Sequence, residues 1–312
     1  MKLENGTPLQ AHLFSGPASE TDLGCAVVMK ATYEIREGSL EIATNTPWPI
    51  HLAPLETPYG TFPGEVASRK PKTDVLVLGK AKAPRGEAVR QLGVSVSVGS
   101  FRHSLAIFGE RRWERTATGL RPTEPIPFVE MPIVWSNAFG GKVPTAVGDM
   151  PSTDNPAGKG LFLDEDEGDG VPLPNVEDPK QPIRSPQDLP KPVGWGPYPL
   201  AGGVRVAKLR GPDGVPLPFE AAEPWVMGWA HPDLILETPA SGTKIEVEGM
   251  TRGGPIVAAV PAFPARVVLL TGDVASVEAA VAAGALVAKE EGILVGRAVI
   301  ARPRRELFRE YV

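Results

Sequence analysis

The feature that most constrains this chain is a dense run of prolines between Pro122 and Pro199. Sixteen of the 35 prolines of the 312-residue sequence fall in this quarter of it. Each proline removes a backbone donor, fixes φ and moves the preceding residue out of the α region. The run also carries large apolar side chains that solvated linkers lack, such as Phe128 and Phe162. We therefore predict an ordered but irregular segment packed on a folded body, which we call the wrap (residues 122–203).

The segments on both sides of the wrap have the alternation and the turn signals of strands. Residues 24–35, the turn Glu37-Gly38 and residues 39–43 predict a hairpin, and residues 92–108 predict another around Gly99-Ser100. Further ranges are assigned by the same signals: strands at 74–79, 204–209, 244–248, 256–260, 265–270 and 295–301, a loop at 52–69, a loop or one helical turn at 219–227, and one helix at 276–283.

These elements predict a mainly β protein with an antiparallel, sandwich-like body, a long proline- and glycine-rich irregular segment and few short helices. We expect a β-rich body at 1–121, the wrap at 122–203, and a β-rich part with one short helix at 204–312. The 34 glycines together with the prolines favour this class over a helical one.

Composition excludes several classes of partner. A formal net charge of −5 gives no reason to expect nucleic acid or an anionic membrane as a partner. Cys25 is the single cysteine, so an intramolecular disulfide is excluded. The longest apolar run, 279–288, is far shorter than the roughly 20 residues of a membrane-spanning helix. We expect a cytoplasmic protein.

The chain lacks the linear motifs of common catalytic and metal sites. The acidic run 164–169 departs from the EF-hand calcium loop, because Asp169 stands where that loop requires glycine. A solvated acidic loop is favoured, and cation binding by it stays open. The four histidines lack metal-ligand spacing, and neither a serine elbow nor a phosphate loop occurs. We predict no catalytic, metal-binding or cofactor-binding residue. The alternative is a hydrolase using carboxylates assembled by the fold, from Asp74, Glu110 and Asp164.

Three arginines surround a tryptophan at Arg111, Arg112, Trp113 and Arg115. Guanidinium groups stack on indole rings and bind carboxylates through paired hydrogen bonds, so this cluster is a candidate recognition patch. An ordinary solvent face with a half-buried tryptophan explains it equally well. Both interpretations stay open.

Several motifs occur in one order over residues 20–200. They are KPKTDVLVLGKA at 70–81, FGERRW at 108–113, NAFGG at 137–141, NPAGKG at 155–160, LPNVE at 173–177 and PVGWGP at 192–197. In these motifs the chain resembles a family of domain-of-unknown-function proteins encoded with bacterial type VI secretion systems, which are regarded as adaptor chaperones for secreted toxins.

The resemblance implies a protein without catalysis that holds a toxin and helps load it onto the secretion spike. The expected partner is the toxin, and a spike or spike-tip protein is a further candidate. A structural component of the secretion apparatus is an alternative role. The residues that we take from the motifs as candidates for partner binding are Asp74, Arg111, Trp113, Trp135, Phe139, Gly140, Gly141, Asn155, Pro156, Gly158, Asn175 and Trp195. Anchoring the wrap is the competing role for Trp135, Phe139 and Trp195.

Overall fold

The structure is a computed structural model. It describes residues 2–7, 9–17, 23–36, 39–43, 45, 48–65, 70, 72–199, 207–215, 217, 221–262, 267–272 and 296–301. The chain divides into two compact units, which are described separately. The terminal unit comprises Met1–Ala53, Gly64–Ser68 and Pro261–Val312, and the central unit comprises Pro54–Pro63 and Arg69–Val260.

The terminal unit is built from strands of both chain ends. In its three-stranded sheet, β24 (Gly296–Ala301) lies between β1 (Lys2–Glu4), to which it is antiparallel, and β23 (Val267–Gly272), to which it is parallel. Two antiparallel pairs complete the unit: β2 (Gln10–Pro17) with β3 (Leu23–Lys30), and β4 (Tyr33–Arg36) with β5 (Ser39–Ile42). The pairing of β4 with β5 confirms the predicted hairpin, although the predicted strand at 24–35 is interrupted at residues 31 and 32.

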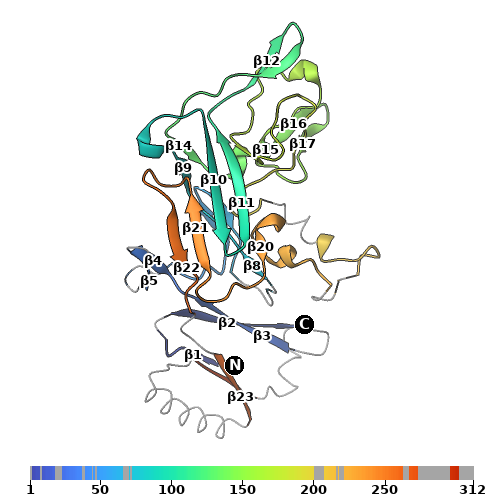
Figure 1. The fold of residues 1–312 in the computed structure, drawn as a ribbon. Coiled ribbons are helices and arrows are strands. Elements are labelled where there is room, and N and C mark those ends of the chain that lie inside the picture. Colours follow the sequence, from blue (N-terminus) through green and yellow to red (C-terminus); the bar gives the residue numbers. More distant parts are fainter. Residues whose placement is uncertain are drawn as a thin grey trace. The chain divides into compact units, whose positions relative to one another are not determined.

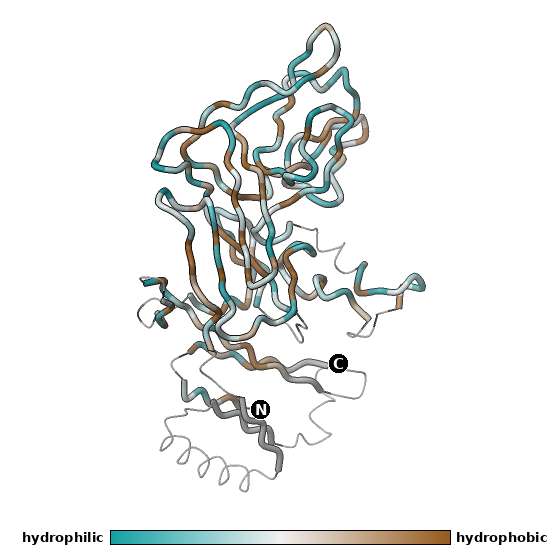
Figure 2. Tube along the Cα trace, in the orientation of Figure 1, coloured by the Kyte–Doolittle hydropathy of each residue, from teal (hydrophilic) through white to brown (hydrophobic). Residues whose placement is uncertain are grey.

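A five-stranded antiparallel sheet organises the central unit (Figure 1). Its order is β19 (Val176–Glu177), β11 (Phe101–Phe108), β10 (Gln91–Val98), β21 (Lys244–Glu248) and β22 (Ile256–Ala259). Paired residues share a face. Val96, His103 and Val247 therefore lie on one face, and Ser97, Arg102 and Glu246 lie on the other. Val94, Val96 and Val98 alternate along β10 and are buried, so the sheet has one apolar face to bury. Figure 2 shows hydrophobic stretches in brown along these strands.

Short ladders and 3-10 turns complete the central unit. The ladders are β6 (Leu55–Thr57) with β7 (Gly60–Phe62), β8 (Thr73–Asp74) with β20 (Ile235–Leu236), β9 (Lys80–Lys82) with β14 (Glu130–Pro132), β12 (Trp113–Thr116) with β13 (Gly119–Pro122), β15 (Phe139–Gly140) with β18 (Lys159–Gly160), and β16 (Lys142–Thr145) with β17 (Gly148–Pro151). The 3-10 turns are η1 (Pro84–Gly86), η2 (Trp135–Asn137), η3 (Glu165–Glu167), η4 (Pro224–Met227) and η5 (Pro232–Leu234). None of the described helices is long and apolar enough to cross a membrane.

The core of the central unit joins the sheet to the wrap. Val94, Val96, Leu105 and Ile107 of the sheet belong to one buried cluster with Ile133, Trp135 and Trp195 of the wrap and with Leu234. A second cluster holds Trp113, Leu120, Leu173 and Ile183. Leu163, in contrast, is exposed. The large side chains of the wrap are therefore mostly anchors that replace secondary structure in fixing its path.

The predicted fold class is confirmed: the described chain is mainly β, its sheets are largely antiparallel, and its helices are short. The strand predicted at 74–79 is wrong beyond Asp74, because the amides of Val75 and Val77 bond to the carbonyls of Leu234 and Trp195 outside any ladder. The loop predicted at 52–69 contains the hairpin β6–β7.

Some sequence predictions are not tested by the described structure. The helix at 276–283 and residues 204–206 of the strand predicted at 204–209 lie outside the described residues. The described part of that strand is wrong, because residues 207 and 208 are helical and residue 209 lies in a turn. The three-part division at 121/122 and 203/204 stays a prediction. In the structure, the wrap up to Pro199 belongs to the same compact unit as β10, β11 and β21.

Candidate functional site

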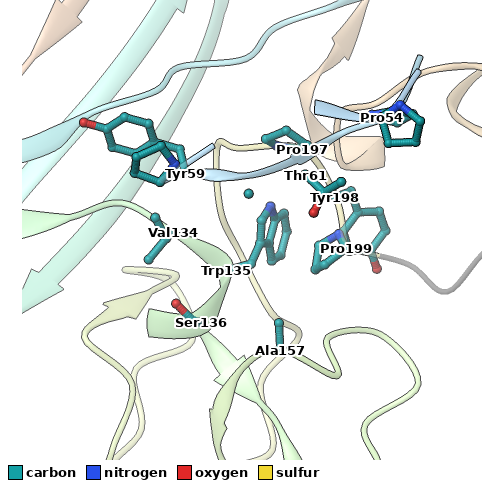
Figure 3. A pocket seen from close by; sticks show the side chains of 13 residues that line it. Pro54, Tyr59, Thr61, Val134, Trp135, Ser136, Ala157, Pro197, Tyr198 and Pro199 are labelled. Carbon is teal, nitrogen blue, oxygen red and sulfur yellow. The ribbon is translucent and has the colours of Figure 1, made fainter. Parts of the chain in front are cut away.

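A groove of about 600 Å³ lies in the central unit beside the hairpin β6–β7. Thirteen residues line it, and most of them present rings: Pro54, Pro58, Tyr59, Pro63, Trp135, Pro197, Tyr198 and Pro199. Figure 3 shows the indole of Trp135 in the middle of these residues, with Pro197 above it and Pro199 beside it. We call this feature the ring groove. Its volume is typical of a ligand-binding pocket.

Trp135, in the 3-10 turn η2, is held in one orientation. Its Nε1 donates a hydrogen bond to the carbonyl oxygen of Gly196 at 2.9 Å, and its ring packs 4.9 Å from that of Tyr198. A Cβ on Gly194 would lie 3.0 Å from two ring atoms of the indole. Glycine therefore lets this backbone pass close to the ring, which accounts for the first glycine of the PVGWGP motif.

Two partly buried histidines, His103 and His231, contact tryptophans of the wrap. The ring of His231 lies 5.7 Å from Trp135 and 4.8 Å from Tyr198. Its Nδ1 accepts the amide N–H of Asp233, and Nδ1 of His103 accepts Nε1–H of Trp195 at 3.0 Å. Burial lowers the pKa of both imidazoles, with the charge of Asp233 acting in the opposite direction. Because each Nδ1 accepts a hydrogen bond, the neutral form of each ring carries its proton on Nε2.

Asn155 ties the loop of the NPAGKG motif to η2. Its side chain is fully buried, and Nδ2 donates to the carbonyl oxygens of Trp135 and Phe139, each at 2.9 Å. Gly140 and Gly141 have φ of 135° and 102° and pass so close to this loop that a Cβ on either would overlap its backbone. The NAFGG and NPAGKG motifs therefore fit together as two interlocked loops.

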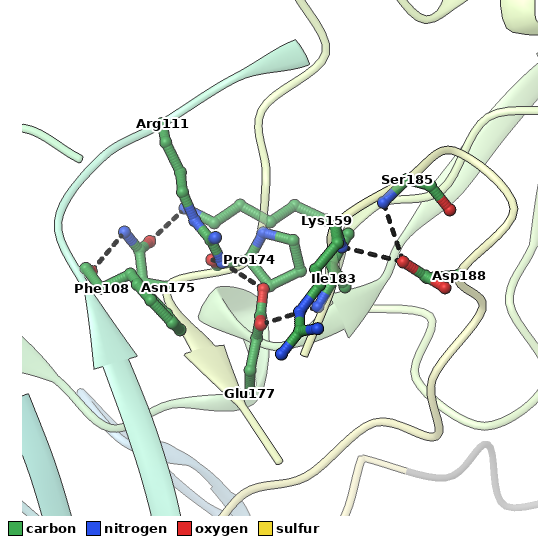
Figure 4. Close-up of polar contacts among 10 residues, drawn as sticks. Phe108, Arg111, Lys159, Pro174, Asn175, Glu177, Ile183, Ser185 and Asp188 are labelled. Carbon is green, nitrogen blue, oxygen red and sulfur yellow. Dashed lines mark hydrogen bonds and ion pairs between the residues drawn. The ribbon is translucent and has the colours of Figure 1, made fainter. Parts of the chain in front are cut away.

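The LPNVE motif connects these loops to the sheet (Figure 4). Nδ2 of Asn175 donates to the carbonyl oxygen of Phe108, and Oδ1 accepts a hydrogen bond from Lys159. Glu177, in edge strand β19, forms a buried ion pair with Arg111 and also accepts the amide N–H of Ile183 at 3.1 Å. Burial raises the pKa of the Glu177 carboxyl, while the charge of Arg111 opposes that shift.

The arginine cluster does not form an exposed patch around Trp113. Arg111 is buried, and its guanidinium carbon lies 3.9 Å from the centroid of the Phe108 ring. Trp113 is 2% exposed and packs edge-on against Phe162. Arg115 turns to the acidic loop, where its Nη2 donates to the carbonyl oxygen of Glu165. The alternative prediction, a half-buried tryptophan on a solvent-exposed face, is therefore also wrong, because Trp113 is buried.

The other candidate residues have roles within the chain. Asp74 accepts the amide N–H of Trp229 at 2.7 Å and pairs with Lys70 at 2.8 Å. Trp195 is fully buried, Phe139, Pro156 and Gly158 are partly buried, and Gly158 lies against Asn155. Of the candidate set, Trp135 lines the ring groove. Contact of the others with a partner stays a prediction.

The carboxylates of the alternative hydrolase have separate partners. Asp74 holds Trp229, Glu110 lies 3.7 Å from Lys159, and Asp164 caps η3 by accepting the amide N–H of Asp166. Within the described residues, no group of three or more His, Cys, Asp or Glu side chains is placed to hold a metal ion.

Sequence analysis missed most of the groove residues. Pro54, Tyr59 and Thr61 come from a segment predicted as loop, and Pro197 and Pro199 come from the far end of the wrap. The one trace of the groove in the motifs is Gly196 of PVGWGP, where a Cβ would lie 2.8 Å from the carbonyl oxygen of Tyr59.

Comparison with known proteins places the chain in a family. The model of a family described as an uncharacterized protein conserved in bacteria (DUF2169) matches residues 21–295. A search of curated proteins and a search of solved structures each found no match. Because the family model covers most of the sequence, the chain belongs to this bacterial family of uncharacterized proteins.

Proposed function

We propose that this chain is a non-enzymatic adaptor that binds and stabilises a type VI secretion toxin in the cytoplasm and helps load it onto the secretion spike. The order of the motifs from 70 to 197 supports the proposal through the resemblance to adaptor chaperones. The geometry of the ring groove supports it on physical grounds.

The observation that carries the proposal is the preformed apolar surface of the ring groove. Burial of apolar surface is the main favourable contribution to protein association. Trp135 is already fixed by Gly196 and Tyr198, so binding does not have to order it. A rigid surface loses little conformational entropy when a partner segment covers it. A groove of this kind suits a protein that holds an apolar segment of a client.

The motif residues support this role indirectly. Asn155, Asn175 and Arg111 make their hydrogen bonds to other parts of the same unit, and each is buried. They fix the path of a segment that lacks long strands or helices, and that segment supplies Trp135 and the prolines 197 and 199 of the groove. On this account the motifs maintain the binding surface and need not touch the client.

A gene deletion tests the proposal in the native host. Deleting the gene should lower the level or the secretion of the toxin encoded beside it, because an unprotected client is degraded or is not loaded. Complementation with the wild-type gene should restore both. Unchanged toxin abundance and secretion in the deletion strain would contradict the proposed function.

A further inference from the structure

The chemistry of the ring groove restricts what it binds. Its described lining offers prolines, three aromatic rings and the small side chains of Thr61, Val134, Ser136 and Ala157, and none of these is charged at neutral pH. A charged group placed among them would lose hydration without gaining a partner. The part of a ligand that enters the groove is therefore uncharged and apolar.

The residue types of the lining favour an extended segment with rings of its own. Aromatic-lined grooves are a recurrent way of recognising polyproline II segments, whose prolines fit between aromatic side chains and whose backbone is already stiff. The Nε1 donor of Trp135 is used by Gly196 and its indole is 3% exposed, so the aromatic surface open to a ligand comes mainly from the partly buried Tyr59 and Tyr198. The main interaction that the ring groove offers to a ligand is therefore packing of the ligand's rings against the rings of the lining.

A carboxylate stands at the rim of this uncharged lining. Thr61 lines the groove, and its Oγ1 donates to both carboxylate oxygens of Glu56, at 2.7 and 2.9 Å. Glu56 is exposed on β6, across the hairpin from Thr61. A basic side chain that flanks the apolar part of a ligand would meet this carboxylate without entering the groove.

We propose that the ring groove binds an extended, proline-containing segment of its client, with a basic residue next to the prolines that pairs with Glu56. This inference rests on the proposed adaptor function and names the class of segment that the adaptor holds. A helical apolar segment or a small apolar molecule would occupy the same space without requiring proline or a basic flank.

Peptide titration of the full chain tests the inference. The probes are terminally blocked octaproline, the same peptide with one arginine added at an end, and a glycine–serine peptide that carries the same arginine. Binding is followed by calorimetry and by the fluorescence of the tryptophans. We expect both proline peptides to bind and the glycine–serine peptide not to bind. The peptide with arginine should bind about threefold to tenfold more tightly at low salt.

Two variants identify the site, and a third serves as control. Tyr59→Ser removes a lining ring and should weaken octaproline binding at least about tenfold. Glu56→Gln removes the negative charge and keeps the size of the side chain, so it should abolish the preference for the peptide with arginine. Leu189→Ser, an exposed apolar position outside the ring groove, should leave binding unchanged. Far-ultraviolet circular dichroism and thermal unfolding confirm that each variant is folded.

The outcomes separate this inference from the proposed function. If octaproline fails to bind at millimolar concentration, if the glycine–serine peptide binds equally well, or if folded Tyr59→Ser binds as wild type does, the inference is overturned. A client that still co-purifies in any of these cases leaves the adaptor function standing. If Glu56→Gln still binds octaproline but no longer prefers the peptide with arginine, the result supports the proposed contact between Glu56 and the basic residue of the ligand.

Discussion

Replacing Asn155 by alanine tests the idea that buried polar contacts hold the wrap. Nδ2 of Asn155 satisfies the carbonyl oxygens of Trp135 and Phe139, each at 2.9 Å, and the side chain is fully buried. Alanine would leave the carbonyl of Phe139 without this donor, whereas the carbonyl of Trp135 would keep the amide N–H of Ala138 at 3.1 Å. An unsatisfied buried polar group costs about 1–3 kcal/mol, so we expect a loss of about 1–3 kcal/mol in the free energy of unfolding.

The effect is large enough to measure in the intact chain. For a unit of about 200 residues, each kcal/mol corresponds to about 2–4 °C in Tm, so Asn155→Ala should lower Tm by about 2–12 °C. Urea unfolding followed by tryptophan fluorescence gives the free energy, and calorimetry gives Tm. Gln187→Ala, which truncates an exposed amide in the same unit, is the matched control and should change stability by less than about 0.5 kcal/mol. If Asn155→Ala matched this control, the account of the wrap would be wrong.

Two further predictions concern buried charge and pH. Arg111→Leu and Glu177→Leu should each cost about 3–5 kcal/mol, because each leaves one buried charge unpaired. The double variant should cost clearly less than their sum, and additive losses in urea unfolding would show that the pair is not coupled. Because burial lowers the pKa of His103 and His231 below 6.5, the unfolded chain binds more protons as the pH falls below that value. The free energy of unfolding should therefore decrease as the pH falls below about 6.5, and it should decrease less steeply in His103→Gln than in wild type. Equal dependence on pH in the two proteins would show that His103 does not contribute.

The class of fold follows from the sequence because alternation and turn chemistry are local. The segments 92–98 and 104–108 alternate around Gly99, and the structure pairs them as β10 and β11. The segment 74–79 has the same apolar character, yet only Thr73 and Asp74 form a ladder. The hydrophobic pattern of a segment indicates that the segment is buried. It does not indicate whether the backbone groups of that segment are hydrogen-bonded to a neighbouring strand or to a loop. In this case the partners are Leu234 and Trp195, far along the chain.

The candidate site was harder to predict from the sequence than the fold class, because its residues come from segments that are far apart in the chain. Residues of the motifs have structural roles: Asn155 and Asn175 are buried and hydrogen-bonded, and a Cβ on Gly140 would overlap the backbone of Asn155. Constraint in the sequence does not distinguish a residue that binds a partner from one that supports the surface beside it. The ring groove joins Pro54 and Tyr59 to Pro197 across more than a hundred residues, and only the folded chain brings them together.

Co-purification from the native host tests the central claim most directly. The full chain, carrying an affinity tag, is isolated as wild type, as Tyr59→Ser and as Leu189→Ser, and the bound proteins are identified by mass spectrometry. We predict that the toxin encoded beside the gene is recovered with wild type and with Leu189→Ser, and that its yield falls severalfold with Tyr59→Ser. Failure to recover a toxin with folded wild-type protein would contradict the account.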